Sequence, residues 1–243
     1  MGLTVAAYLL LVLVVVPVIS RRTAAGGLLT TLPRPTLYRS SMATAWTLTL
    51  IGAVVLVMAP ELTVPKVRLI GLSPVGFLTH LGITLAGLAA ATLFTALLRK
   101  MLRRPESRDV LYLVPRTGHE RRLFWGVSVT AGLTEEFVFR GIALTALAGV
   151  LPVSDDLAPW AAAAIVAVAF GFGHGYQDGL GMLRAGFLGF LLAVPAILTG
   201  SLLPGMAAHT LFDLTLITRL GRTLVGTAGD APSDEQQPEG IPL

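Results

Sequence analysis

The sequence predicts an all-α membrane protein, a multi-pass bundle of about seven transmembrane helices. Three observations carry this prediction. Of the 243 residues, 54% are hydrophobic and only 13% are charged, whereas a soluble domain carries about 25% charged residues. The mean hydropathy is +0.76. The apolar residues also gather in runs close to the roughly 20 residues that a membrane-crossing helix needs.

Seven runs qualify or nearly qualify as spans: 3–19, 42–59, 75–98, 123–150, 160–174, 182–199 and 204–220. No basic residue precedes the first run, which favours a retained span over a cleaved signal peptide. Lys and Arg gather in cytoplasmic loops of membrane proteins. With the N-terminus outside, 15 of the 18 basic residues fall on the cytoplasmic side. We therefore expect a cell-membrane protein whose C-terminus is cytoplasmic.

The chain divides by composition into four segments. They are the N-terminal spans 1–98, a basic segment 99–122, a core 123–222 whose spans contain ionisable residues, and a polar, Pro-rich tail 223–243 that we expect to be disordered. The basic segment is either an amphipathic helix on the membrane surface or an ordinary basic loop. The net charge of +4 follows this membrane pattern and does not indicate nucleic-acid binding. The absence of cysteine excludes disulfides, cysteine zinc sites and thiol nucleophiles.

Few ionisable residues fall inside the apolar runs, where each costs about 2.5–3.5 kcal/mol on insertion scales. They are Glu135, Glu136, Arg140, His174, His209, Asp213 and His80. We interpret His80, which has no partner in any motif, as a structural histidine. Arg184 is interpreted as a charge that sets the topology.

The spacing of Glu135, Glu136 and Arg140 predicts two different roles for the glutamates. Glu136 and Arg140 are four residues apart on one helix face and can form an ion pair. Glu135 is rotated by about 100° and faces something else. The alternative interpretation is that all three form a structural polar knot.

The later spans add His174, which ends an apolar run, and the pair His209 and Asp213, four residues apart. Such a pair can chelate a metal, or the carboxylate can orient the imidazole. Each feature alone could equally be a helix cap or a buried hydrogen bond. Lipid does not tolerate these side chains on outward faces, so we expect them to meet in the bundle interior.

Carboxylates and imidazoles gathered at one point can activate a water molecule. The sequence contains no HExxH and no GxSxG motif, and Ser128 and Ser201 have no evident base beside them. Hydrolysis by an activated water is therefore favoured over a covalent intermediate.

Three ordered motifs carry a resemblance to a known family. They are "EEFVFR", which fits EExxxR, then FxxxH at Phe170–His174, and HxxxN/D at His209–Asp213. Residues 122–220 thereby resemble the CPBP family of intramembrane proteases, which includes CAAX proteases and bacteriocin-processing enzymes. The last motif ends in Asp213, where many members have Asn.

The resemblance implies that Glu135 activates water, that His174, His209 and Asp213 complete the site, and that Glu136 and Arg140 support it. It implies a metalloprotease, with His174, His209 and Asp213 as ligands for zinc or another divalent metal. The expected function is cleavage of a membrane-tethered or lipidated protein, with membrane lipids as further partners, no nucleic acid, and the oligomeric state open. Two alternatives are a proton or cation transporter using the same groups and a non-catalytic adaptor or immunity protein.

The predicted span ends place His174 near the inner membrane face and His209 near the outer face. The two imidazoles meet only if the spans tilt strongly or if the Gly- and Pro-containing turn 200–205 dips into the membrane, shielded by protein.

Overall fold

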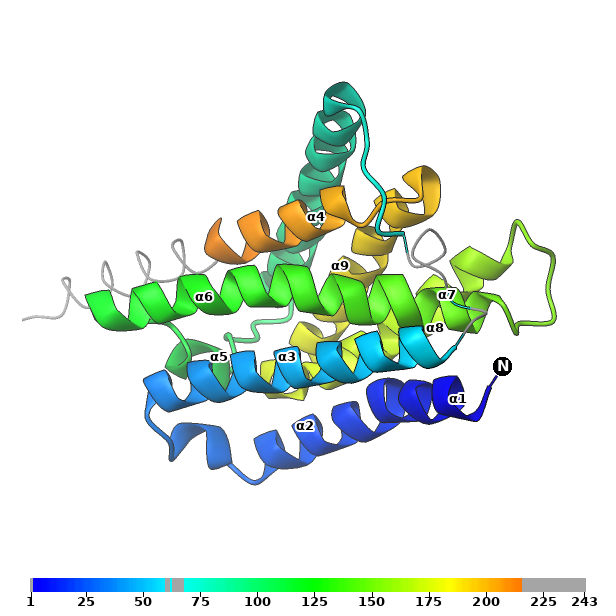
Figure 1. Ribbon diagram of the computed structural model, residues 1–243. Helices are drawn as coiled ribbons and strands as arrows, with labels where there is room; N and C mark the ends of the chain where they lie inside the picture. The colour runs from blue at the N-terminus through cyan, green and yellow to red at the C-terminus, as the bar shows by residue number, and fades with distance from the viewer. Residues whose placement is uncertain (1, 60–61, 63–67, 216–243) are drawn as a thin grey trace, which may run out of the picture.

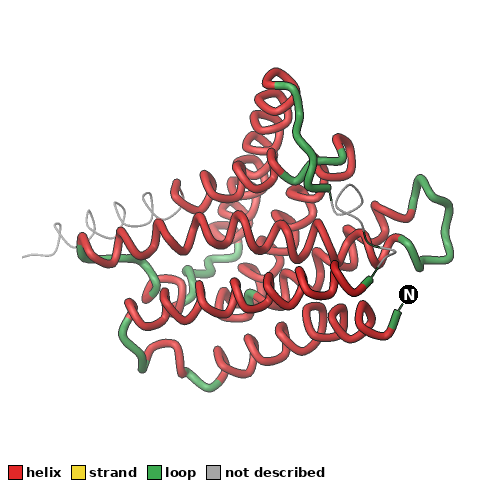
Figure 2. Tube along the Cα trace, viewed as in Figure 1, coloured by secondary structure: helices red, strands yellow, loops and turns green. Residues whose placement is uncertain are grey.

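The computed structural model describes residues 2–59, 62 and 68–215, and most of this range is helical, with no strand in it (Figure 1; Figure 2). The described elements are α1 Leu3–Leu10, η1 Leu11–Val15, α2 Val16–Ala25, η2 Leu28–Thr30, α3 Arg34–Met58, α4 Pro74–Met101, α5 Arg108–Tyr112, α6 Gly118–Glu135, η3 Glu136–Ala143, α7 Leu144–Ala148, α8 Ala158–Gly173, η4 Gly175–Gln177 and α9 Asp178–Thr199. A last helix begins at residue 203 and is described to residue 215. The predicted all-α membrane bundle is confirmed.

Four helical segments are long and apolar enough to cross a membrane: Leu3–Ala25, Arg34–Met58, Pro74–Met101 and Gly175–Thr199. The shorter apolar helix α8 lies at the predicted span 160–174. Large apolar side chains such as Val57, Leu50 and Leu93 are 86%, 64% and 61% exposed. Such faces would be unfavourable in water but suit contact with lipid chains.

The helices pack in two groups, and both groups contact α6 or its continuation η3. α3 packs against α6, and α2 packs against α8. α4 crosses these helices at a steep angle in Figure 1 and packs against α9, which in turn packs against α8. Helices from both ends of the sequence therefore surround α6 and its continuation.

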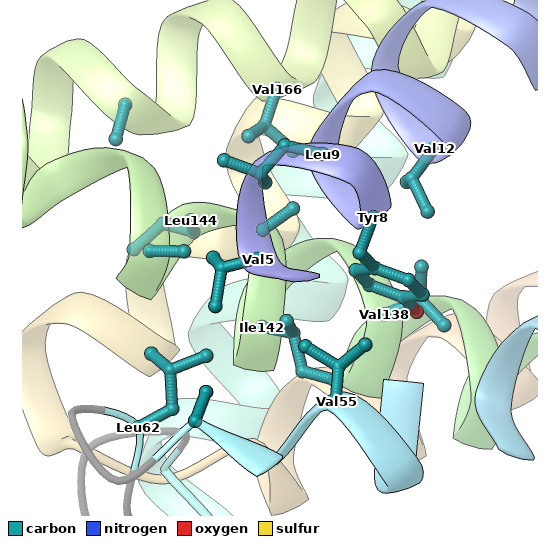
Figure 3. Close-up of a cluster of buried hydrophobic side chains, with 14 of the residues drawn as sticks. Val5, Tyr8, Leu9, Val12, Val55, Leu62, Val138, Ile142, Leu144 and Val166 are labelled. Carbon is teal, nitrogen blue, oxygen red and sulfur yellow. The ribbon is translucent and has the colours of Figure 1, made fainter. Parts of the chain in front are cut away.

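A buried apolar cluster joins the N-terminal spans to the core (Figure 3). Val5 and Tyr8 of α1 and Val12 of η1 contribute to it, and so do Val55 of α3 and Ile142 of η3. Tyr8 also donates a hydrogen bond to the carbonyl of Leu48 at 3.1 Å. The predicted segments 1–98 and 123–222 thus share one hydrophobic interior.

The basic segment 99–122 does not form one long surface helix. Its interior holds only the five-residue helix α5, which Ser107 caps by accepting from the Val110 N–H. The next helix begins at Gly118 rather than at 123, because Thr117 and Glu120 form a capping box that satisfies its first N–H groups. The structure is therefore close to the ordinary-loop alternative.

The turn between α9 and the last helix lies inside the protein. Gly200 ends α9 with a φ of +67°, a conformation that glycine adopts without strain. Ser201 is 0% exposed and its hydroxyl donates to the Ile70 carbonyl at 2.6 Å, while Leu202 N–H donates to the Arg68 carbonyl at 2.9 Å. Segment 68–70 thus shields the turn, as the second sequence-based alternative requires. The tail 223–243 lies outside the described residues.

Candidate active site

The centre of the site is a wide helical turn between α6 and α7. Glu136 begins the π-helical segment η3, and Arg140 lies one turn further along it. Their side chains form an ion pair, with Arg140 Nη1 3.0 Å from Glu136 Oε1, and each is 1% exposed. This confirms the ion pair predicted from the spacing. π-Helical turns occur frequently at functional sites.

Neighbouring helices hold the Arg140 guanidinium from two sides. Its Nη2 donates to the Gly189 carbonyl of α9 at 2.8 Å, and its central carbon lies 4.5 Å from the Phe170 ring centroid of α8. A side chain at Gly189 would place a Cβ 3.1 Å from Arg140 Nη2, a tight contact that glycine avoids. The ion pair therefore ties the core helix to α8 and α9.

His209, on the last helix, completes this buried set. Its Nδ1 donates to Glu136 Oε1 at 2.9 Å, and its ring is almost fully buried. The spacing left two roles for Asp213, to orient His209 or to bind a metal; Asp213 Oδ2 lies 3.7 Å from His209 Nε2, beyond hydrogen-bond distance. The structure assigns the orienting contact to Glu136, which the helical spacing could not reveal.

Glu135, unlike Glu136, lines a cavity. Its carboxylate is 29% exposed, and Oε2 lies 4.0 Å from His209 Nε2. Asp213 is similarly accessible at 28%. The His209 ring thus presents Nδ1 to the buried glutamate and Nε2 to the two accessible carboxylates.

His174 ends α8, close to the same place. Its Nδ1 lies 2.8 Å from the Phe170 carbonyl. Because a carbonyl oxygen can only accept, Nδ1 carries the hydrogen and Nε2 is left for other partners. The Phe170 ring lies between the two histidines, with its centroid 4.6 Å from that of His174 and 6.4 Å from that of His209.

A cavity of about 570 Å³ connects these groups. Glu135, His174, His209 and Asp213 all line it. Most of the remaining wall is apolar and comes from the first helix, α3, α6 and α9. The four side chains that the sequence analysis assigned to one pocket therefore do share one.

Close helix packing brings His209 to the depth of the site. Gly132 of α6 lies against the last helix, where an added Cβ would be 2.8 Å from the Met206 carbonyl and closer still to Thr210 Oγ1. The buried turn at residues 200–202 starts that helix inside the protein. Together these features bring His209 to the cavity that His174 also lines.

The expected metal ligands His174, His209 and Asp213 are of the types that bind zinc. They line one cavity, but within residues 2–59, 62 and 68–215 no group of three or more His, Cys, Asp or Glu side chains is placed to hold a metal ion. The arrangement therefore does not match a ready metal site, and the ligand set stays a prediction. No step below depends on it.

Several polar residues of the cavity wall were not recognised from the sequence, among them Tyr176, Gln177 and Arg184. Tyr176 and Gln177 come two and three residues after His174, and this closeness in sequence is the signal that could have pointed to them. Arg184 had been interpreted as a topology-setting charge. His80 lies on α4 and uses Nδ1 to contact the Gly76 carbonyl at 2.8 Å, consistent with the structural role expected for it.

A comparison with protein families matches residues 119–215 to the family described as type II CAAX prenyl endopeptidase, Rce1-like. Residues 119–215 are therefore similar to that family over two fifths of the chain. The match covers α6, η3, α7, α8, α9 and the last helix to residue 215, the helices that carry the whole candidate site. The resemblance stated from the three motifs is thereby confirmed. Neither curated proteins nor solved structures gave a match.

Proposed function

We propose that the protein is an intramembrane endopeptidase in which Glu135 activates the attacking water. The similarity of residues 119–215 to a CAAX endopeptidase family supports a membrane-embedded peptidase. The observation that carries the finer proposal is the shared cavity, into which an accessible carboxylate and two imidazoles project. A carboxylate and imidazoles around one water molecule are sufficient for hydrolysis by general acid–base catalysis.

In the proposed reaction the Glu135 carboxylate takes a proton from a cavity water, and the water oxygen bonds to the substrate's carbonyl carbon. The resulting oxyanion is stabilised by His209 in its imidazolium form, whose Nδ1–H is donated to Glu136 and whose Nε2–H is the donor to the oxyanion. The C–N bond then breaks, and the proton held by Glu135 passes to the leaving amine. One glutamate thus serves first as a base and then as an acid.

Glu136 and Arg140 position His209 and do not react. The buried Glu136 carboxylate accepts from His209 Nδ1, which directs Nε2 toward the cavity. Arg140 balances the charge of Glu136. This is the usual role of a carboxylate behind a functional histidine.

The proposed substrate is a membrane-tethered protein that carries a lipid or other apolar group near the cleaved bond. The cavity wall supports this, because it includes Val12 and Val16 of the first helix, Leu48 of α3, and Val127 of α6. These side chains form an apolar surface beside the polar groups. An apolar substituent would remove that surface from water.

The test is cleavage of a lipid-anchored peptide library by the purified protein in liposomes, with Glu135→Gln as the variant. Loss of a general base should lower kcat by about 10²- to 10⁴-fold. Equal cleavage by wild type and variant would refute the role of Glu135. Proton flux measured in the same liposomes, without any cleavage, would instead indicate the transporter alternative.

A further inference from the structure

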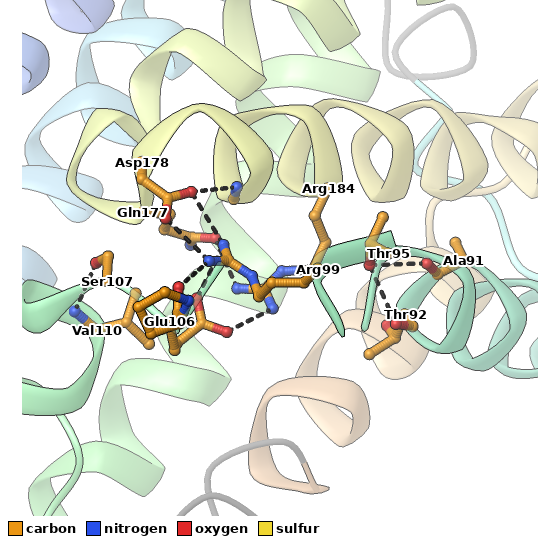
Figure 4. A network of polar contacts seen from close by, with 12 residues as sticks. Ala91, Thr92, Thr95, Arg99, Glu106, Ser107, Val110, Gln177, Asp178 and Arg184 are labelled. Carbon is orange, nitrogen blue, oxygen red and sulfur yellow. Dashed lines mark hydrogen bonds and ion pairs between the residues drawn. The ribbon is translucent and has the colours of Figure 1, made fainter. Parts of the chain in front are cut away.

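A second polar network lies where α4, α5 and α9 meet, and one arm of it reaches the cavity of the candidate site (Figure 4). Arg99 forms a fork with Asp178 through two contacts of 2.9 Å each and does not line the cavity. Glu106 lies between Arg99 and Arg184, with Oε2 3.3 Å from Arg184 Nη1. Arg184 and Gln177 do line the cavity. The arm that begins at Glu106 therefore ends beside the groups proposed to react.

The hydrogen bonds of this arm all run in one direction. Arg184 can only donate, so the Gln177 atom that lies 3.2 Å from its Nη2 must be the amide oxygen Oε1. This contact fixes the orientation of the amide group, whose Nε2 donates to the Tyr176 hydroxyl oxygen at 3.1 Å. The hydroxyl is thus an acceptor from Gln177, and its own hydrogen must point elsewhere. Within the part of the chain that the structure describes, no group accepts that hydrogen.

Local packing holds Tyr176 and Gln177 next to His174. Both residues belong to η4, which follows His174 directly. The Tyr176 ring centroid lies 5.9 Å from that of His174, and the Ser107 hydroxyl donates to the Tyr176 carbonyl at 2.7 Å. An added Cβ at Gly181 would be 2.3 Å from the Gln177 Cβ, so glycine leaves room for that side chain. The chain of hydrogen bonds therefore ends at a fixed place in the cavity wall.

The Tyr176 hydroxyl lies on the side of the residue that faces the candidate site. Tyr176 separates two hollows, since it lines this cavity and also a second one of about 460 Å³. Gln177, which contacts the hydroxyl, lines the first cavity and not the second. The hydroxyl hydrogen is therefore available to a group bound in the cavity that Glu135 and His209 also line.

The other tyrosine of the described cavity wall has no hydrogen to offer. Tyr38 of α3 also lines the cavity, but its hydroxyl donates to the Leu113 carbonyl at 2.7 Å. A carbonyl oxygen can only accept, so the hydrogen of Tyr38 is committed to the backbone. The two tyrosines thus differ in hydrogen bonding and not in residue type, which makes Tyr38 a natural comparison for Tyr176.

We propose, building on the peptidase function above, that the Tyr176 hydroxyl donates a hydrogen bond to the carbonyl oxygen of the bond being cleaved. This oxygen gains negative charge when water attacks, so an oriented donor stabilises the transition state more than the bound substrate. Tyr176 is then a catalytic residue that supplies a second donor beside His209. It keeps its proton throughout the reaction. Gln177 and Arg184 are positioning residues, because they set the direction in which the hydroxyl donates, and the Arg184 charge polarises the chain toward a stronger donor.

The first test compares Tyr176→Phe with wild type on two membrane-anchored peptides that carry either oxygen or sulfur at the cleaved carbonyl. Loss of one such donor should lower kcat for the oxygen peptide by about 10²- to 10³-fold and leave KM nearly unchanged. Sulfur accepts hydrogen bonds more weakly than oxygen, so kcat for the sulfur peptide should fall much less. The preference for oxygen should therefore be smaller in the variant. Tyr176→Phe keeps the ring beside His174 and should unfold at the same detergent concentration as wild type.

Tyr38→Phe is the matched control, because Tyr38 lines the same cavity with a committed hydrogen. It should leave the preference for oxygen over sulfur as it is in wild type. If Tyr176→Phe leaves either kcat or this preference unchanged, the proposal is overturned. A wild type that cleaves neither peptide would instead refute the peptidase function itself.

A second test reverses the direction of the chain. Gln177→Glu keeps an acceptor for Arg184 but places a second carboxylate oxygen, which can only accept, at the Tyr176 hydroxyl. The hydroxyl should then donate to that oxygen and no longer to the substrate, and kcat should fall toward the level of Tyr176→Phe. In the Tyr176→Phe background the same substitution should have little further effect, because both changes remove one interaction. Wild-type kcat in Gln177→Glu, or full additivity of the two losses, would contradict the proposed direction.

Discussion

Substitution by Gln at the adjacent residues Glu135 and Glu136 should abolish activity in both cases but lower folding stability only at Glu136. Glu136→Gln removes the negative partner of Arg140 inside the protein and weakens the acceptor for His209 Nδ1. We expect a large loss of folding stability together with loss of activity. Glu135→Gln changes an accessible side chain and should abolish activity while the fold is retained.

The size of the stability loss expected for Glu136→Gln follows from the burial of Glu136 and Arg140. Glu136 and Arg140 are each 1% exposed, and removing one member of a buried ion pair costs about 3–5 kcal/mol, because the other charge stays buried without compensation. The weakened bond to His209 belongs to the same network, so its cost does not simply add. Glu135 is 29% exposed and lies 4.0 Å from its nearest cationic partner, His209. Its replacement should change the free energy of unfolding by about 0.5 kcal/mol or less.

The assay is reversible unfolding in mixed micelles with increasing denaturing detergent, followed by tryptophan fluorescence. A double variant, Glu136→Leu with Arg140→Met, supplies a second comparison. Replacing both charges by apolar groups should recover most of the stability lost in Glu136→Gln. It should not recover cleavage, since His209 would still lack its acceptor.

Two results would contradict this reasoning. If Glu136→Gln unfolds at the same detergent concentration as wild type, the ion pair is not a buried constraint on the fold. If the double variant cleaves substrate normally, Glu136 does not position His209.

Two further predictions concern helix packing and pH. Gly132→Ala should displace the last helix, because the added Cβ would press on Thr210, and this displacement should abolish cleavage. The control is Gly82→Ala on α4, where an added Cβ would have nothing within 4 Å and cleavage should be normal. Normal cleavage by Gly132→Ala would refute the packing argument. Burial alone would raise the pKa of Glu120, which precedes the predicted span 123–150, but the N–H groups of Arg116 and Thr117, together with the Arg34 guanidinium, lower that pKa below its ordinary value. The stability that Glu120 contributes is therefore present at neutral pH and lost as the pH falls through this lowered pKa. Wild type and Glu120→Gln should differ in unfolding free energy at pH 7 and converge in acid, and a constant difference would exclude this role.

Sequence reasoning worked best where helical spacing decides a contact. The Glu136–Arg140 ion pair and the separate direction of Glu135 follow from helical rotation alone, and both are present. The composition of the sequence was sufficient to predict a membrane protein. The convergence of three spans followed from the cost of exposing ionisable groups to lipid.

The contacts that could not be predicted are those made across the fold. His209 has a carboxylate four residues away in Asp213, yet it is oriented by Glu136, which is 73 positions distant in sequence. Spacing along one helix predicts which residues of that helix are neighbours. It does not predict which residues of other helices pack against them. The position of Arg184 in the cavity wall could not be predicted for a similar reason. A basic residue near a span end usually sets topology, and only the folded chain shows that this one enters the cavity wall.

The π-helical segment Glu136–Ala143 has a consequence for how the chain tolerates length changes. A π-turn accommodates one residue more than an α-turn, so the backbone could lose a residue here and close normal α-helical hydrogen bonds. Everything beyond the deletion would then swing by about 100° around the helix axis. A one-residue deletion between Glu136 and Arg140 would thus leave an intact helix and misdirect Arg140, a change that helix content measured by circular dichroism would not report.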